Sequence, residues 1–183
     1  MSNQIIVDLI KKSKVWDEFK NHDKIIIKVT KELISLTELS KFLKGNLQKK
    51  NQLEVSISLV SDSQMQKINQ KFRQKNKPTD VLSFPFLDEK MIHNVGLAKT
   101  IKSSTIASHL PLGDIIISYQ TLKKDANKER KTFQHHLTHL LLHSILHLIG
   151  YDHEELEMEK EMRKIEVNIL EKLGIKNPYI TNE

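Results

Sequence analysis

The sequence predicts a single compact domain of the α/β or α+β class, built from one small sheet and several helices. Segments with the two-residue alternation of strands are interspersed along the chain with segments of helical periodicity. The 183 residues are 38% hydrophobic and contain no repeat or low-complexity segment. This composition suits one ordinary core, so we expect one domain over residues 1–183.

The first part of the chain is expected to form a strand, a helix and a second strand. Residues 4–10 alternate weakly, which indicates a strand. Residues 24–44 carry apolar side chains at helical spacing and precede Gly45, a common helix stop, so we predict a helix, although the β-branched start also fits a strand. Residues 53–60 alternate and are rich in β-branched side chains, which predicts a strand.

A helix and two more strands follow. Ser61 and Gln64 have the spacing of a capping box at a helix start. Residues 79–86 and 112–120 have strand patterns, and Pro85 indicates that the first of these strands ends at a sheet edge or lies on one. The predicted helix presents one apolar face, made of Met65, Ile68 and Phe72.

The second half contains a long connection and two helical regions. Residues 87–111 lack periodicity, and a connection of that length is usually a functional flap or disordered. A long helical region is predicted over 122–149, broken near Asn127, and a last helix over 154–173, stopped by Gly174. The core face of the long region consists of Phe133, Leu137, Leu140, Leu141, Ile145 and Leu148.

The net charge of +6 is unevenly distributed. Residues 152–183 carry nine acids and five bases, so residues 1–151 carry 24 bases against 14 acids, a net of +10. A basic body of this kind is compatible with binding a polyanion such as nucleic acid, although a lysine-rich solvated surface fits equally well.

The chain has no cysteine, which excludes thiolate metal sites and suits a reducing compartment. The N-terminal stretch lacks the pattern of a signal peptide, and no run approaches the ~18 apolar residues of a membrane span. We therefore expect a soluble, cytoplasmic protein that does not bind membranes. Any metal would be held by nitrogen and oxygen.

Six of the nine histidines lie between residues 135 and 153. Helical residues four apart share a face, so His139 with His143, or His143 with His147, could converge on one ion. His139 and His147 are about 12 Å apart along the helix axis at ~1.5 Å per residue, too far for one zinc ion with ligands at ~2 Å. One ion can therefore use only one of the two pairs.

A third histidine selects the second pair. Gly150 can adopt the positive φ that ends a helix and reverses the chain, which brings His153 back toward His147. We predict one zinc ion on His143, His147 and His153, with water in the open fourth position, as in catalytic zinc sites. Such a site lowers the pKa of the water to ~7. We expect three histidines to be ordinary polar positions or neighbours of the ligands: His135, His136 and His139.

The segment HSILHLIGYDH, residues 143–153, resembles the signature of the YbeY family, bacterial rRNA maturation factors and single-strand-specific, metal-dependent endoribonucleases. INQKFRQKNKPTDVLSFPF (68–86) and LGDIIIS (112–118) agree with further family blocks, and the resemblance covers about 53–173. It implies a small α/β fold with a mixed sheet of about four strands and zinc on the three histidines. It also implies a role in ribosome assembly and small-subunit rRNA end processing.

By position, the resemblance matches Arg73 with a functionally important arginine and the three histidines with metal ligands. We expect Arg73 and His143 to be catalytic and Arg73 to contact phosphate, although a helix-end arginine can also be merely solvated. Ten aromatic residues indicate no stacking ladder, so weak sequence preference is expected. Three further cations are expected to track an RNA backbone: Lys71, Lys75 and Lys77.

Two features depart from the family pattern. Ser144 stands where the family has glycine, and serine is small enough that we expect close helix packing to survive. The connection 87–111 is longer than the family norm, which bears on substrate access. Asp152 is expected either to orient a ligand histidine or to cap the final helix, and capping is the favoured role.

Three functions are compatible with these features. We favour a monomeric, zinc-dependent endoribonuclease acting on single-stranded rRNA, in which either hydroxide or the RNA's own 2′-hydroxyl attacks. The second is a ribosome-assembly factor that binds RNA and ribosomal proteins with little catalysis. The third is a hydrolase of another substrate, but zinc peptidases have a glutamate after the first helical histidine, where this chain has Ser144.

Overall fold

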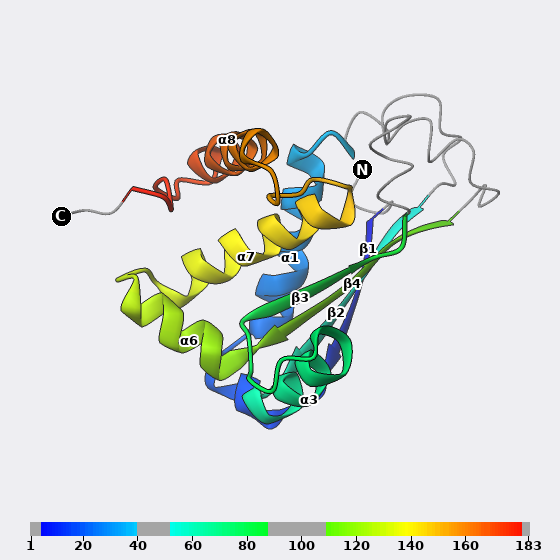
Figure 1. Cartoon of the computed structure of the whole chain (residues 1–183), viewed down its shortest axis with the longest axis vertical. Helices are drawn as coiled ribbons and strands as arrows, with labels where there is room; N and C mark the ends of the chain where they lie inside the picture. Colours follow the sequence, from blue (N-terminus) through cyan, green and yellow to red (C-terminus); the bar gives the residue numbers. More distant parts are fainter. Residues whose placement is uncertain (1–4, 40–51, 88–108, 181–183) are drawn as a thin grey trace.

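The computed structural model describes residues 5–39, 52–87 and 109–180 (Figure 1). Four strands form one mixed sheet in the order β1-β2-β4-β3. The strands β1 (Ile5–Lys11), β2 (Gln52–Val60) and β4 (His109–Ser118) run parallel, and β3 (Val81–Pro85) pairs antiparallel with β4 at one edge. The predicted α/β class and the small mixed sheet are therefore confirmed.

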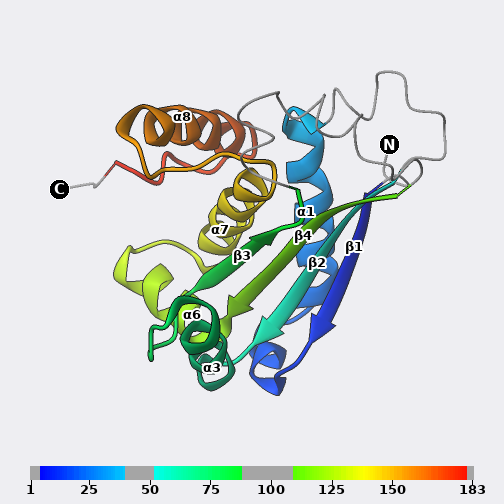
Figure 2. The same ribbon diagram turned by 45° about the vertical axis from the view of Figure 1, so that its right-hand side comes forward.

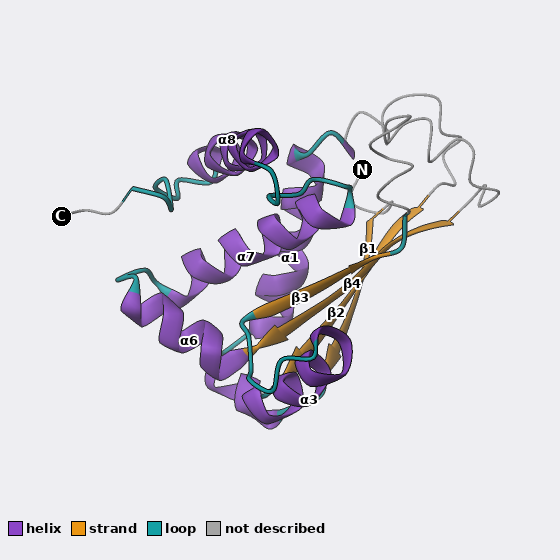
Figure 3. Ribbon diagram, viewed as in Figure 1, coloured by secondary structure: helices purple, strands orange, loops and turns teal. Residues whose placement is uncertain are grey.

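Helices lie on both faces of the sheet (Figures 2 and 3). In the large core, α1 and α7 pack on one face of the sheet and α8 packs against α7. On the other face, α3 packs in a smaller cluster. Among the described residues, no helix has the length and apolar character that a membrane crossing requires. The helices are the 3-10 helix η2 (Lys14–Glu18), α1 (His22–Leu36), α3 (Asp62–Arg73), α6 (Tyr119–Lys128), α7 (Phe133–Leu148) and α8 (Leu156–Lys172).

Alternation along the central strands decides which helix packs on which face. Ile57 of β2 and Ile115 of β4 are buried in the large core with α1 and α7. Val60 of β2 and Ile116 of β4 point the other way and meet Met65 of α3 in a smaller cluster. Because successive side chains of a strand point to opposite faces, two helical layers can cover one sheet.

The helix predicted over 24–44 is shorter than expected. α1 ends at Leu36, where Thr37 becomes extended and its hydroxyl donates to the carbonyl of Ile34 at 2.8 Å. The β-branched start is helical, so the strand alternative is wrong. Gly45, the predicted stop, and nearly all of the connection 87–111 lie outside the described residues.

The strand predicted over 112–120 is displaced toward the N-terminus, because β4 covers His109–Ser118 and Tyr119 already begins α6. A distant carboxylate stabilises this early helix start. Asp62 accepts hydrogen bonds from the backbone N–H of Thr121 at 3.0 Å and from its hydroxyl at 2.9 Å. The predicted break in the long helical region is confirmed, since α6 ends at Lys128 and α7 begins at Phe133.

The edge position predicted from Pro85 is confirmed, since β3 is the last strand of the sheet. Pro85 pairs with Gly113 of β4. A Cβ on Gly113 would lie 2.2 Å from the carbonyl oxygen of Phe84 and 3.0 Å from Leu148 of α7. The absence of a side chain at Gly113 thus allows β3, β4 and the end of α7 to approach closely.

Candidate metal centre and basic cleft

Three histidines come together at the C-terminal end of α7. His143 and His147 are one turn apart on α7, and His153 lies in the loop before α8. One ligand nitrogen from each lies within 4.8 Å of the others, and Nε2 of His143 is 3.1 Å from Nε2 of His147. Two nitrogens bound to one tetrahedral ion at ~2.0–2.1 Å are roughly 3.3 Å apart. The cluster therefore has the donor type and the spacing of a metal site.

The chain reversal that returns His153 to α7 occurs at Gly150. This residue has a φ of 93°, in the range that favours glycine. Its N–H donates to the carbonyl of His147 at 3.0 Å, and the N–H of Tyr151 donates to the carbonyl of Leu146 at 3.0 Å. These two bonds form a Schellman motif, so the reversal predicted from the sequence is confirmed.

A buried carboxylate fixes the orientation of His143. Oε1 of Glu166, a fully buried residue of α8, lies 2.9 Å from Nδ1 of His143. Burial alone would raise the pKa of Glu166, but the neighbouring His139 and hydrogen bonds from His143 and Tyr179 outweigh it and lower the pKa to about 2. A carboxylate only accepts hydrogen bonds, so Nδ1 carries the proton and Nε2 offers its lone pair toward His147. This is the tautomer that a metal on Nε2 requires.

The residues after α8 close over this carboxylate. Gly174 has a φ of 73° at the end of α8, and the hydroxyl of Tyr179 donates to Oε2 of Glu166. Cζ of Arg163 lies 4.7 Å from the centroid of the Tyr179 ring. Burial and the adjacent carboxylate raise the pKa of Tyr179, which keeps its hydroxyl protonated and able to donate.

Sequence reasoning missed both Glu166 and Tyr179. A signal for Glu166 exists, because it lies in the buried stripe of α8 with Met162, Ile169 and Leu170, where an unpaired carboxylate would be costly. The position of Tyr179 depends on the turn after Gly174, and no local pattern predicts it.

His147 is in the neutral form that can bind a metal. Burial, together with the nearby His143 and His153, lowers the pKa of His147 to about 4, so the ring is uncharged at neutral pH. Nε2 of His147 lies 3.1 Å from Nε2 of His143, close enough for both ring nitrogens to bind one ion. The donor set and its geometry thus fit one divalent ion with nitrogen ligands, such as zinc.

The three remaining histidines of α7 lie outside this cluster. Nε2 of His139 is 3.8 Å from Oε1 of Glu166, so His139 borders His143 through the shared carboxylate. His136 is buried, and burial lowers its pKa. His135 is exposed, and its backbone N–H donates to the Thr132 hydroxyl at the start of α7.

The capping role favoured for Asp152 is wrong. α8 begins at Leu156, two residues later than predicted, and its N-cap is Glu155 without a side-chain hydrogen bond. Asp152 instead accepts a hydrogen bond at 2.7 Å from the backbone N–H of His153. Its carboxylate therefore supports the loop that carries His153.

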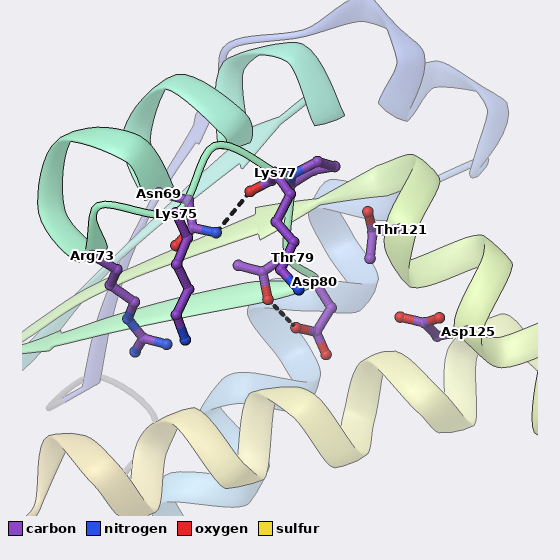
Figure 4. Close-up of a pocket in the computed structure, with 9 residues that line it drawn as sticks. Asn69, Arg73, Lys75, Lys77, Thr79, Asp80, Thr121 and Asp125 are labelled. Carbon is purple, nitrogen blue, oxygen red and sulfur yellow. Dashed lines mark hydrogen bonds between the residues drawn. The ribbon is translucent and has the colours of Figure 1, made fainter.

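Arg73 lies in a cleft of about 350 Å³ that the three histidines do not line (Figure 4). Figure 4 shows Arg73, at the end of α3, and Lys75, in the loop that follows, projecting toward α7, the helix that carries His143 and His147. Lys71 points elsewhere, with Nζ 5.2 Å from the ring centroid of Phe72. The cleft thus gathers three of the four predicted cations. Its lining residues are Asn69, Arg73, Lys75, Lys77, Pro78, Thr79, Asp80, Thr121 and Asp125.

A buried amide holds the basic loop after α3. Gln74 ends the helix with a φ of 57°, in the left-handed region. Nδ2 of Asn69, which is buried, donates to the carbonyl of Lys77 at 2.7 Å. This bond ties the segment that carries Lys75 and Lys77 to α3. Sequence reasoning missed Asn69, although a polar residue one turn after Met65 on an apolar face was a signal.

Ser144 is fully buried in α7, and its Oγ has no hydrogen-bond partner in the described part of the chain. The expectation that a small residue suffices here is consistent with this burial. A glutamate at this position would have to be buried, and Ser144 offers no carboxylate where zinc peptidases have their general base.

Comparisons with known proteins agree with this geometry. The family model described as Endoribonuclease YbeY matches residues 18–174. The Endoribonuclease YbeY of Bartonella henselae is 36% identical over 176 residues, covering 96% of this chain and 97% of that protein. That of Francisella philomiragia is 40% identical over 134 residues, covering 73% and 77% of the two chains. A solution structure of a Thermotoga maritima protein has a TM-score of 0.52 at 24% identity, covering 92% of both chains, which supports the fold.

Proposed function

The chain belongs to the YbeY endoribonuclease family, and from this premise we propose that it is a zinc-dependent endoribonuclease that cleaves single-stranded RNA. We propose further that it matures small-subunit rRNA ends in the cytoplasm and contacts the ribosome or ribosomal proteins during assembly. In this proposal it acts as a monomer of one domain.

The metal part of the proposal is carried by one observation. The Nε2 atoms of His143 and His147 converge at 3.1 Å while Glu166 holds Nδ1 of His143 from behind. In the proposal, His143, His147 and His153 hold the ion. Bound there, zinc would supply Lewis-acid chemistry toward a phosphate oxygen and lower the pKa of a water molecule.

The RNA part rests on the cations of the cleft and on the family. In the proposal, the Arg73 guanidinium pairs with phosphate oxygens, for which its planar fork of donors is suited. Lys75 and Lys77 line the same cleft and attract the flanking backbone without reading sequence. The net charge of +10 over residues 1–151 favours the same partner.

The proposal is tested by removing the metal and adding it back, and by comparing single-stranded and duplex RNA of the same sequence. Chelation of the purified protein should abolish cleavage of a single-stranded RNA and lower the melting temperature, since an ion that binds only the native state stabilises it. Addition of one equivalent of zinc should restore both. Cleavage of a duplex of the same sequence should stay low. Undiminished cleavage by metal-free protein would refute the metal dependence, and equal cleavage of the duplex would refute the single-strand preference.

A further inference from the structure

Two exposed phenylalanine rings lie at the end of α3 and just beyond β3, and Phe72 directly precedes Arg73, which lines the basic cleft. Phe72 is 57% exposed and Phe86 is 58% exposed. Phe72 was expected to pack on the apolar face of α3, but the helix buries Met65 and Asn69 instead. Exposing a large aromatic ring to water is unfavourable. Packing of α3 therefore does not account for the aromatic ring at position 72.

The Phe72 ring is nevertheless held in place from behind. Its centroid lies 5.1 Å from that of Phe84 on β3, with the ring planes at 63°. Phe84 is half-buried and packs with Val60, Met65 and Leu82 in the smaller core cluster. An edge-to-face pair of this kind fixes one ring and leaves much of its surface open. Phe72 and Phe84 are far apart in sequence, so no local pattern indicates the pair.

One cation lies over the exposed ring, and three others follow it in the chain. Nζ of Lys71 lies 5.2 Å from the Phe72 centroid, within the range of a cation–π contact. Arg73 follows directly in the chain and lines the cleft with Lys75 and Lys77. An exposed aromatic surface among positive charges is the arrangement that single-stranded nucleic acid recognises, with bases on rings and phosphates on cations.

We propose that Phe72, supported by Phe84, is a stacking platform for one unpaired base of the RNA, next to the phosphate that Arg73 contacts. This inference rests on the proposed function and adds a reason for the single-strand preference. In a duplex, both faces of each base are covered by its neighbours, so no base can stack on Phe72 without leaving the helix. Every base has a π face, so the platform favours unpaired RNA with little sequence preference.

Binding of a 2′-O-methyl oligonucleotide to the metal-loaded protein, with the oligonucleotide shown by electrophoresis to stay intact, tests the proposal apart from catalysis. Phe72→Ala and Phe72→Leu should weaken binding roughly 5- to 150-fold, the range for loss of one stacked base. Phe72→Tyr, which keeps a flat ring, should bind almost as the wild type does. Ile10→Ala is the matched control, since Ile10 is an exposed apolar residue, 40% accessible, on the opposite edge strand.

A scan of abasic positions along the oligonucleotide separates stacking from a structural role. One position should exist where removal of the base weakens binding to the wild type but not to Phe72→Leu. If the wild type binds RNA and Phe72→Leu binds equally well, or if every abasic position affects both proteins alike, the platform is wrong while the proposed function stands. If the wild type does not bind RNA at all, the proposed function fails together with the platform.

Discussion

The carboxylate of Glu166 lies 2.9 Å from Nδ1 of His143 and has no exposed surface. This contact joins α8 to the candidate ligands on α7 and sets the ring of His143 with Nε2 toward His147. The hydroxyl of Tyr179 donates a hydrogen bond to the other oxygen of the carboxylate. The C-terminal helix and the segment after it therefore belong to the metal centre.

Glu166→Gln should weaken zinc binding by about 10- to 100-fold, the usual effect of losing a partner that orients a ligand histidine. An amide can still bond to Nδ1 but no longer balances the charge of the ion. Affinity is measured by competition with a chromophoric chelator. Glu171→Gln, an exposed position on the same helix, is the control. Equal zinc affinity of Glu166→Gln and the wild type would contradict the orienting role.

Purified protein should contain close to one equivalent of zinc or a similar ion, and His147→Ala should remove most of it. His139→Ala should retain the ion, because His139 contacts Glu166 and lies outside the cluster of three. Elemental analysis of dialysed protein measures both contents. Loss of the ion from His139→Ala with retention by His147→Ala would mean that His139 and His143 hold the ion instead.

Ser144→Ala should stabilise the protein, because it removes a buried hydroxyl without a hydrogen-bond partner among the described residues and raises helix propensity. The expected gain is about 1 kcal/mol, or roughly 2–4 °C in melting temperature for a domain of this size. Ser144→Glu should instead destabilise the fold by burying a charge. Neither variant nor the wild type should cleave casein, and efficient cleavage would contradict the exclusion of peptidase chemistry.

Arg73→Ala should fold and keep its zinc but lose on the order of 10² to 10³ in RNA cleavage rate, the scale of one electrostatic donor. Arg73→Lys should recover only part of the lost cleavage rate, because lysine keeps the charge but lacks the bidentate fork of donors. Lys67→Ala, an exposed cation on the same helix, controls for the loss of charge. A higher KM with an unchanged kcat would mean that Arg73 only binds the RNA and does not stabilise the transition state.

Local patterns predicted most elements of the fold and the histidine cluster. The H-x3-H spacing and the helix-ending Gly150 are local features, so they defined the set of His143, His147 and His153 before any tertiary contact was known. Helix boundaries were less accurate where a distant residue decides them. Asp62 of α3 accepts hydrogen bonds from Thr121 and so stabilises the first turn of α6. This long-range contact explains why the strand predicted over 112–120 extends too far toward the C-terminus.

The supporting residues of the site required the structure. In the sequence, Glu166 is one of several acidic residues in a charged helix. Its contact with His143 depends on the packing of α8 on α7, which the sequence does not show. The pair of Phe72 and Phe84 depends on how α3 turns back beside β3. The ten aromatic residues indicate no stacking ladder in the sequence, whereas the contact of Phe72 with Phe84 supports the stacking of a single base.

The most direct test of the central proposal compares the wild type with the triple variant His143→Ala, His147→Ala and His153→Ala. Both proteins are purified in parallel and supplied with zinc at one defined concentration. Each is then incubated with single-stranded ribosomal RNA, with the enzyme in molar excess over the RNA. We expect the wild type to cleave the RNA and the variant to lose cleavage to background, while its circular dichroism spectrum stays helical. Cleavage at the wild-type rate in the triple variant would contradict the metal-dependent mechanism, because the activity would then come from another site or from a contaminant.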